Sequence, residues 1–581
     1  MVQGMAEPVV FEKVMSLAKR RGLVWPSFEL YGGTAGFFDY GPMGAQIKIN
    51  IEDIWRRYYV IGEGFELIQC PHIAPEPVFQ ASGHLSHFSD LLVECTKCGE
   101  PFRADHLVKD KVENADGLPA AEIDALIEKH GVKCLVCGGK LSAAVPFNLM
   151  FKTNIGPGGK RPGYLRPETA QGMFVNFLTL YRFCREKLPF GVVQIGSVYR
   201  NEISPRQGML RLREFNQAEA EVFIHPDEKT HRNFPAIADD RLHLVPAHGV
   251  EGDYTIKEAM KKGLIRSEIV AYYVALTCRY LLEVGLDPKR LRFRQHGDDE
   301  MAHYASDCWD AEAQTSFGWV EIVGVADRTN FDLTEHSKHS GQDLQAFIKF
   351  DESKVEKVTK IISKPNILGP LFKKDAKAVK EALEALDGEK ISKQQKGKKA
   401  PITVKVGGKD LEVPADGYDI VEKEEKVSGS RVTPHVIEPS YGIDRIIYTL
   451  IEHAFFETTK ENEPYTVLRL KTGVAPIKVG VFPLMAKDGL SELAWDLNED
   501  LKAHGLRTYF DESGTVGKRY ARMDEIGTPW CVTVDYDSKT DGTATIRDRD
   551  STEQVRVKIS EIPDVICELL AGKDFKTFLK K

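Results

Sequence analysis

Two pairs of cysteines are the first candidates for chemistry in this chain. Cys95-Thr-Lys-Cys98-Gly and Cys134-Leu-Val-Cys137-Gly-Gly each place two thiols on a tight turn that glycine allows. Four such sulfurs suit a closed tetrahedral zinc site, so we expect a structural Zn²⁺ held by all four cysteines. The 35 residues between the pairs exceed the spacing of about 15–20 that is usual in zinc ribbons. A metal-free thiol cluster and a redox pair therefore remain alternatives.

Arginines at both ends of a polar loop form the second candidate. Tyr199-Arg200-Asn201-Glu202 precedes the loop 203–210, and Arg211-Leu-Arg-Glu-Phe215 follows it. The planar guanidinium grips phosphate at two points and stays charged in a dry site. The pattern predicts a nucleotide cradle between two strands. A hairpin with exposed salt bridges is the alternative.

A third candidate combines an arginine with the start of a helix. The run Val436-Ile-Glu438-Pro439-Ser440 reads as extended, and Gly442 opens an apolar helix with Arg445 in its first turn. Backbone amides and an arginine at a helix start together bind anions, although any capped helix could carry such an arginine.

Glutamates form the fourth candidate. Glu168 stands before a small-residue turn, which suits recognition of an ammonium group, and Glu219 and Glu438 could join it. A surface capping residue is the alternative for Glu168 taken singly.

The elements that must position these residues can be read from periodicity. Apolar residues at helical spacing predict a helix over 43–60, followed by an extended run from Phe65 to Pro71. Strand-like alternation covers 192–200, 209–223 and 317–325. Within the second of these, Gln217, Glu219 and Glu221 share one face, and the small apolar residues between them share the other. From residue 475, strands and a helix alternate, which predicts a separate α/β domain.

Composition sets wider limits. The chain has 581 residues, 42% hydrophobic and 28% charged, as in globular proteins. We expect no secretory signal and no membrane span, and ten cysteines without an export signal favour a reducing, cytoplasmic location. The net charge of −8 argues mildly against a nucleic-acid partner. Fifteen lysines and no arginine lie between 351 and 410, which favours a solvated insertion over an RNA-binding arm.

Taken together, these stretches resemble a class II aminoacyl-tRNA synthetase, and more closely the dimeric glycyl-tRNA synthetase family. The helix 43–60 with the strand ending at Pro71 resembles motif 1, Arg200 to Phe215 resembles motif 2, and Gly442 to Arg445 resembles motif 3. Asp444 stands where the general pattern has Glu. Stretches that resemble the glycyl branch are 31–42, 82–84, 147–151, 166–172, 292–296, 301–304, 307–310, 326–328 and 438–440, with 517–522 and 524–527 in an anticodon-binding domain.

The resemblance implies an α+β and α/β multidomain fold: an antiparallel-sheet catalytic core with insertions, and a C-terminal α/β anticodon-binding domain. The expected segments are core 1–90 with motif 1, a cysteine-bearing insertion 91–146, core 147–350 with motif 2, a Lys-rich insertion 351–430, core 431–474 with motif 3, and the anticodon-binding domain 475–581.

The family pattern also implies roles for single residues. ATP, used with Mg²⁺, would be bound by Arg200, Asn201, Glu202, Arg211, Leu212, Glu321, Ile322 and Arg445, and Arg200 and Arg445 would be catalytic. Glycine would be surrounded by Glu168, Glu219, Glu438, Pro439 and Ser440. Glycine has no side chain to recognise, so selection must come from its ammonium group and from absent space.

The expected activity is that of a glycine–tRNA ligase acting on tRNA(Gly), as a homodimer joined through motif 1. Diadenosine tetraphosphate synthesis is an expected side activity. The alternatives are a class II synthetase for proline, threonine or histidine, a non-catalytic RNA-binding relative, and a zinc module that binds nucleic acid. The presence of Arg200, Arg445 and the glutamates favours the glycine–tRNA ligase over these alternatives.

Overall fold

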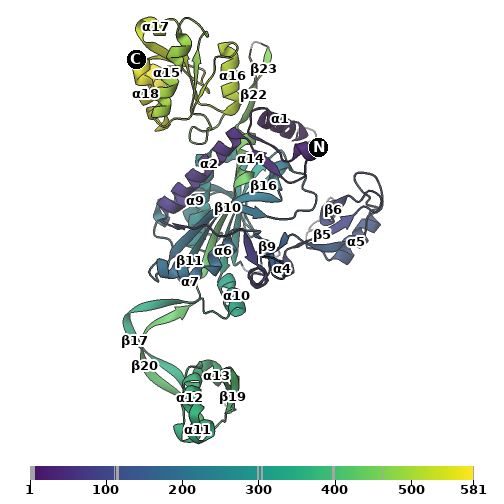
Figure 1. Cartoon of the computed structure of the whole chain (residues 1–581), viewed down its shortest axis with the longest axis vertical. Coiled ribbons are helices and arrows are strands. Elements are labelled where there is room, and N and C mark those ends of the chain that lie inside the picture. Colours follow the sequence, from purple (N-terminus) through teal and green to yellow (C-terminus); the bar gives the residue numbers. More distant parts are fainter. Residues whose placement is uncertain are drawn as a thin grey trace. The chain divides into compact units, whose positions relative to one another are not determined.

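The computed structural model describes residues 7–109, 111–112, 115, 117–297, 300–302, 305–395, 399–460 and 462–579. His303 and Tyr304 of the stretch 301–304, and parts of the expected segments at both chain ends and in the Lys-rich insertion, lie outside them. The chain forms two compact units, Met1–Leu344 with Thr433–Lys581, and Gln345–Val432 (Figure 1). No helix in these described ranges is long and apolar enough to cross a membrane.

A nine-stranded, largely antiparallel sheet is the centre of the first unit. Its edge strand β3 pairs in parallel with β10, so the extended run expected up to Pro71 contributes only two residues to the sheet. In sheet order the strands are β13 (Gly252–Thr255), β12 (Arg241–Val245), β14 (Leu291–Gln295), β15 (Asp307–Thr315), β16 (Gly318–Thr329), β21 (His435–Gly442), β11 (Glu214–Ile224), β10 (Phe190–Tyr199) and β3 (Glu66–Leu67).

The two faces of this sheet differ in polarity, as the alternation in β11 predicts. The even-numbered residues from Ala218 to Val222 are buried in the main hydrophobic core. The odd-numbered residues from Gln217 to Glu221 are buried too, but they are polar and point to the opposite face. The functional groups described below come from this polar face.

Helices cover the apolar face. They are α2 (Pro42–Arg56), which continues as a π-helical turn at Arg57–Gly62, α9 (Glu268–Val284) and α14 (Ile443–Ala454). Helix α2 begins with a proline in its first turn, where no amide hydrogen bond is lost. A Cβ at Gly44 would lie 1.9 Å from the carbonyl oxygen of Leu23, so only glycine allows this close packing. The expected helix over 43–60 is thus present.

Shorter elements surround the sheet. They are α1 (Glu7–Arg20), β1 (Val24–Pro26), β2 (Phe38–Tyr40), β4 (Ile73–Pro75), α3 (Glu76–Ala81), α4 (His84–His87), β8 (Lys152–Asn154), β9 (Pro162–Leu165), α6 (Ala170–Val175), α7 (Phe177–Phe183), α8 (Ile256–Lys261) and α10 (Phe331–Ser340).

The two cysteine pairs lie in a small subdomain with its own core around Val93, Phe102 and Ile123. It touches the loop between β10 and β11, because Ser204 Oγ donates to the carbonyl of Pro101 and Arg206 lies 2.6 Å from Glu100. Its elements are β5 (Ser89–Glu94), β6 (Pro101–Arg103), α5 (Ala120–Lys129) and β7 (Val145–Asn148).

The C-terminal domain is α/β, as the alternation from residue 475 predicts. Its five-stranded sheet has the order β25 (Thr508–Phe510), β24 (Val479–Pro483), β26 (Trp530–Val534), β27 (Thr543–Asp548) and β28 (Gln554–Lys558). The first three strands are parallel. Its helices are α15 (Leu490–Ala503), α16 (Val516–Ile526), α17 (Ser538–Asp541), α18 (Ile562–Leu570) and α19 (Lys576–Leu579), and the hairpin β22 (Phe455–Lys460) and β23 (Glu463–Leu468) precedes them.

The second unit contains the Lys-rich stretch. Two long antiparallel strands lead to a small core of buried side chains that includes Leu368, Val379 and Tyr418. The lysines on its helix α12, Lys377 and Lys380, are exposed. The elements are β17 (Ala346–Ser363), α11 (Pro365–Phe372), α12 (Ala376–Glu384), α13 (Gly388–Gln395), β18 (Ile402–Val406), β19 (Lys409–Val413) and β20 (Tyr418–Val432).

Candidate active site

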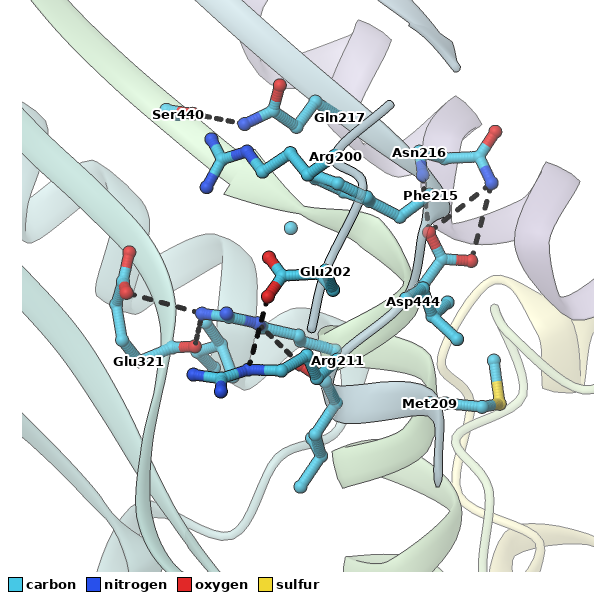
Figure 2. A pocket seen from close by; sticks show the side chains of 15 residues that line it. Arg200, Glu202, Met209, Arg211, Phe215, Asn216, Gln217, Glu321, Ser440 and Asp444 are labelled. Carbon is cyan, nitrogen blue, oxygen red and sulfur yellow. Dashed lines mark hydrogen bonds and ion pairs between the residues drawn. The ribbon is translucent and has the colours of Figure 1, made fainter. Parts of the chain in front are cut away.

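The arginines singled out in the sequence converge on one pocket, which we call the arginine pocket (Figure 2). It lies where β10, β11, β16 and the start of α14 meet. Seven of the eight residues expected to bind ATP line it: Arg200, Glu202, Arg211, Leu212, Glu321, Ile322 and Arg445. Asn201 does not line it, and its backbone N–H donates to the carbonyl of Leu149 at 2.7 Å.

Each arginine of this pocket is held by oxygen atoms of the protein itself. Arg445 donates to the carbonyls of Leu210 at 3.1 Å and Glu321 at 2.8 Å, and to the Glu321 carboxylate at 3.2 Å. Arg211 lies 3.8 Å from Glu202. Arg200 donates to the carbonyl of Pro167 at 3.2 Å. These contacts orient guanidinium groups that can exchange a carboxylate for a phosphate oxygen.

Aromatic rings also fix Arg200. Its guanidinium lies 5.3 Å from the ring centroids of both Phe88 and Phe215. Such cation–π contacts restrict the side chain while leaving its N–H groups available to a ligand.

Asp444, the departure from the general class II pattern, is a structural anchor. It is buried, and its carboxylate accepts hydrogen bonds from the hydroxyl of Tyr40 and the backbone N–H of Asn216. It therefore ties the start of α14 to β2 and β11, which fixes the helix turn that carries Arg445.

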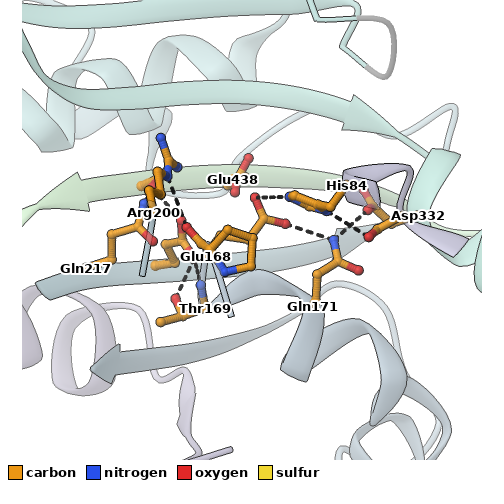
Figure 3. A network of polar contacts seen from close by, with 12 residues as sticks. His84, Glu168, Thr169, Gln171, Arg200, Gln217, Asp332 and Glu438 are labelled. Atoms are coloured by element: carbon orange, nitrogen blue, oxygen red, sulfur yellow. Dashed lines mark hydrogen bonds and ion pairs between the residues drawn. The ribbon is translucent and has the colours of Figure 1, made fainter. Parts of the chain in front are cut away.

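Beside this pocket lies a buried group of carboxylates, which we call the carboxylate pocket (Figure 3). Glu219 is 1% exposed and accepts hydrogen bonds from Ser440 Oγ at 2.6 Å, from the Thr169 N–H at 2.8 Å and from the Thr169 hydroxyl. Burial raises its pKa, the neighbouring Glu168 adds to that, and the hydroxyl and amide donors oppose it.

Glu168 reaches the same pocket from the turn before α6. Gln171 donates to it at 2.8 Å, and His84 Nε2 and Arg328 Nη2 lie 3.7 and 3.9 Å away. Burial works against its ionised form, but His84 and then Arg328 outweigh burial and hold the pKa of Glu168 well below its usual range. Glu168 is therefore the firmly ionised member of the group.

Glu438 is bound to a buried arginine. Arg328 Nη1 donates to it at 2.9 Å, and the same guanidinium donates to Asp332 at 2.8 Å. Burial raises the pKa of Glu438 to about 8, although Arg328 lowers it; Glu219 and Glu168 add to the rise. Pro439 follows in β21 opposite Val325 and brings Ser440 opposite Glu219.

Sequence reasoning assigned no role to Arg328, Asp332, His84 or Gln171. Arg328 and His84 lie in stretches that carry the family resemblance, so their positions were visible. Their function was not, because their partners lie far along the chain: Arg328 and Glu438 are 110 residues apart.

The two pockets adjoin. Ser440 and Gln217 line the arginine pocket, and Gln217 Nε2 lies 3.4 Å from Ser440 Oγ, which donates to Glu219. Arg200 appears at both sites in the close views (Figures 2 and 3). A small molecule with an ammonium group among the carboxylates would therefore place its other end near the arginines.

The four cysteines of the two predicted pairs meet. Their sulfurs all lie within 4.8 Å of one another, with Cys95 and Cys137 at 3.4 Å and Cys98 and Cys134 at 3.6 Å. A tetrahedral ion with metal–sulfur bonds of about 2.3 Å requires sulfur separations of about 3.8 Å. Backbone N–H groups of Lys97 and Val136 point at the sulfurs of Cys95 and Cys134. The donor set fits a metal ion.

Comparison with known proteins decides the family. The family model described as "tRNA synthetase class II core domain (G, H, P, S and T)" matches residues 152–454. The chain is 52% identical to a glycine–tRNA ligase of Methanothrix thermoacetophila over 97% of each chain. The chain belongs to the glycine–tRNA ligase family. Ligases of Archaeoglobus fulgidus and Methanocaldococcus jannaschii are 49% and 47% identical to it, each over 97% of this chain and over 98% and 100% of the relative.

Membership confirms the expected enzyme class and fold. The chain is an aminoacyl-tRNA synthetase with a class II core, and the "Anticodon binding domain" model matches residues 478–569. Such an enzyme uses tRNA, glycine and ATP, the last with Mg²⁺. The inference from net charge against a nucleic-acid partner is wrong, because a whole-chain sum averages buried carboxylates with the surface that RNA meets.

Proposed function

We propose that the two adjoining pockets carry out the first step of glycine attachment to tRNA. The glycine carboxylate attacks the α-phosphorus of ATP, the bond to the β-phosphate oxygen breaks, and glycyl-adenylate and pyrophosphate result. The 3′-hydroxyl of the terminal adenosine of tRNA(Gly) then takes the glycyl group and AMP leaves. The observation that carries this proposal is a buried carboxylate cluster joined through Ser440 to an arginine-lined pocket.

The arginine pocket would hold ATP. Arg200 would bind the α-phosphate during attack, and Arg445 the γ-phosphate, while Arg211, Leu212 and Ile322 would contact the rest of the nucleotide. Each arginine would exchange a protein oxygen for a phosphate oxygen, which leaves the carboxylates of Glu202 and Glu321 free. Mg²⁺ bound with ATP would neutralise phosphate charge, and these two carboxylates could hold it.

The carboxylate pocket would hold the glycine ammonium. Glu168, Glu219 and Glu438 would supply acceptor oxygens from the turn before α6, from β11 and from β21, and Ser440 would set the orientation of Glu219. Because all three side chains are nine-tenths buried or close to it, a methyl group on the substrate would have to displace packed side chains. A larger amino acid is then rejected by a clash, and no editing step is required.

No side chain need act as a general base in this first step. The glycine carboxylate is already a nucleophile, so the protein contributes positioning and charge stabilisation. Arg200, fixed by the rings of Phe88 and Phe215, fits that task.

We also propose that the four cysteines hold a structural Zn²⁺. Two sulfur separations of 3.4 and 3.6 Å and the N–H groups aimed at two of the sulfurs support it. The ion would fix the subdomain that contacts the loop between β10 and β11.

A homodimer through the motif 1 region is proposed as well. β3 is an edge strand, and Leu67 in it, Ile61 before it and Phe183 of α7 are 50%, 77% and 68% exposed. A hollow of about 710 Å³ lined by Phe65, Phe183 and Phe190 adjoins this edge. Exposed apolar groups at a sheet edge are typical of an interface. Sedimentation at a mass of two chains is expected, and a single-chain mass at micromolar concentration would contradict it.

The cytoplasm is the proposed location, since all ten cysteines lie among the described residues and none of them forms a disulfide there. The test of function is charging of tRNA(Gly) with labelled glycine by the full chain. We expect acid-precipitable label that depends on ATP. Absence of charging with folded protein would overturn the proposal.

A further inference from the structure

Glu221 is a fourth glutamate beside the carboxylate pocket, and the proposed reaction does not use it. It lies in β11 two residues after Glu219, so both side chains point to the polar face of the sheet. Its side chain is 0% exposed. Neither of its carboxyl oxygens has a hydrogen-bond partner among the residues that the structure describes.

The neighbours of Glu221 are mostly acidic. Pairing of Glu219 with Ser440 and of Val222 with Ile437 fixes the register, which places Glu221 opposite Glu438 on β21. Glu219, Glu221 and Glu438 each have one oxygen within 4.8 Å of the other two. Four charged groups act on Glu221: Glu438 of β21, then Arg328 of β16, Glu219 of its own strand, and Asp332 of α10. On the other side, β10 places the apolar Val192 opposite Glu221.

Glu219 and Glu438 have hydrogen-bond donors among the described residues, whereas Glu221 has none. Glu219 accepts three hydrogen bonds and Glu438 accepts one from Arg328. A buried, unpartnered carboxylate beside two others is costly, and the group keeps its proton instead. Burial and the negative charge of Glu438 raise the pKa of Glu221 well above its usual range. The protonated acid has an O–H that needs an acceptor.

We propose that Glu221 is a positioning residue whose carboxylic acid O–H donates to the oxygen of Glu438 that Arg328 does not bind, and thereby holds Glu438 against the glycine ammonium. The inference rests on the proposed glycine site. Arg328 and Glu221 then grip Glu438 from two sides, one as a cation and one as a neutral donor. Glu221 adds rigidity without a further negative charge.

The role of a neutral donor differs from that of a ligand to the ammonium. A ligand would have to be ionised, and an amide could not replace it. A donor can be replaced by glutamine, whose side chain has nearly the same shape and whose N–H₂ donates in place of the O–H.

The experiment compares Glu221→Gln with Glu221→Leu, and uses Glu219→Gln to test the glycine site itself. Glycine-dependent pyrophosphate exchange gives KM and kcat from pH 6 to 8, and thermal unfolding and ATP binding show that each variant is folded. We expect Glu221→Gln to keep KM for glycine within about threefold and Glu221→Leu to raise it about tenfold or more with a smaller change in kcat.

The pH profile separates a positioning role from a structural one. If Glu221 is neutral, Glu221→Gln leaves the pH dependence of KM for glycine where it is in the native enzyme. A profile shifted to lower pH in that variant would show that Glu221 carried a charge, and would overturn the proposal. So would equal losses in the Gln and Leu variants, or no change in KM in either. If Glu221→Leu does not fold, the Gln variant and its profile still decide the question.

A failure of the underlying assignment looks different. If Glu219→Gln leaves KM for glycine unchanged, the carboxylate pocket does not bind the ammonium group, and the proposed glycine site itself is wrong.

Discussion

The arginine pocket and the carboxylate pocket lie side by side, yet they are built in opposite ways. The arginine pocket is open: Arg445 and Glu321 are 34% and 51% exposed, and its cations rest on oxygens that a phosphate can replace. The carboxylate pocket is closed, and its Glu219, Glu438 and Arg328 are each less than a tenth exposed. ATP offers several phosphate charges and a large base, whereas glycine offers one ammonium, one carboxylate and no side chain. The smaller substrate therefore needs the more rigid site.

Loss of a cation from the open pocket should have the largest effect. Arg200→Ala removes the group that we propose binds the α-phosphate, and we expect glycine-dependent pyrophosphate exchange to fall by about 10³-fold with the fold intact. Arg241→Ala is the control, since this exposed arginine of β12 in the same sheet pairs with Glu258 at the surface. Pyrophosphate exchange retained in Arg200→Ala would contradict the assignment of Arg200 to the α-phosphate.

A change in the closed pocket should affect glycine and not ATP. Glu219→Gln keeps the shape of the side chain but removes the charge, so kcat/KM for glycine should fall by about 10²-fold, as for a lost charged hydrogen bond. KM for ATP should change little. Glu214→Gln, at the exposed start of the same strand, is the control. An equal loss for both substrates would erase the distinction between the pockets.

The two pockets should also respond differently to pH. Burial raises the pKa of Glu438 to about 8, so below that pH its acid form offers no charge to the ammonium group. KM for glycine should therefore fall as pH rises from 6 to 8, by up to about tenfold per unit. KM for ATP should stay flat because arginines remain protonated. A flat profile for glycine in the native enzyme would show that Glu438 does not change its charge over this range.

Metal removal should act on the open pocket alone, and most weakly. The loop between β10 and β11, which borders the arginine pocket, contacts the cysteine subdomain through Ser204 and Arg206. Chelation, or Cys134→Ser, should release one zinc ion per chain and raise KM for ATP about threefold to tenfold, below the roughly hundredfold cost of a 1 Å misplacement. KM for glycine should not move, and Cys567→Ser serves as the control. If no zinc is found, the proposed metal site is wrong. If KM for glycine rises as much as KM for ATP, the effect of the metal is not confined to the arginine pocket.

Sequence alone could predict the elements and charges that are coded locally. The alternation in β11 placed Gln217, Glu219 and Glu221 on one face, and the start of α14 placed Arg445 in its first turn. Both depend on a few adjacent residues. The cysteine spacing likewise predicted the cluster that forms.

Contacts between distant segments could not be predicted. The hydrogen bond from Arg328 to Glu438 depends on the pairing of β16 with β21, whose residues are about 110 positions apart in the chain. The run to Pro71 reads as extended, but its backbone pairing with β10 ends at Ile68, whose N–H donates to the carbonyl of Val193. The Cys70 N–H donates instead to the side chain of Gln194. Arg519, in the stretch 517–522 of the anticodon-binding domain, looks like a surface cation in the sequence. It is 2% exposed and donates to the carbonyls of Pro483, Glu512 and Gly514.

The central claim is that a rigid carboxylate pocket selects glycine by its ammonium group and by lack of space. Pyrophosphate exchange by the full chain, measured with glycine, alanine and serine in turn, tests this claim most directly. We predict exchange with glycine and at least about a hundredfold lower kcat/KM with the other two, as a clash in a packed pocket requires. Alanine or serine supporting exchange as well as glycine would contradict the account.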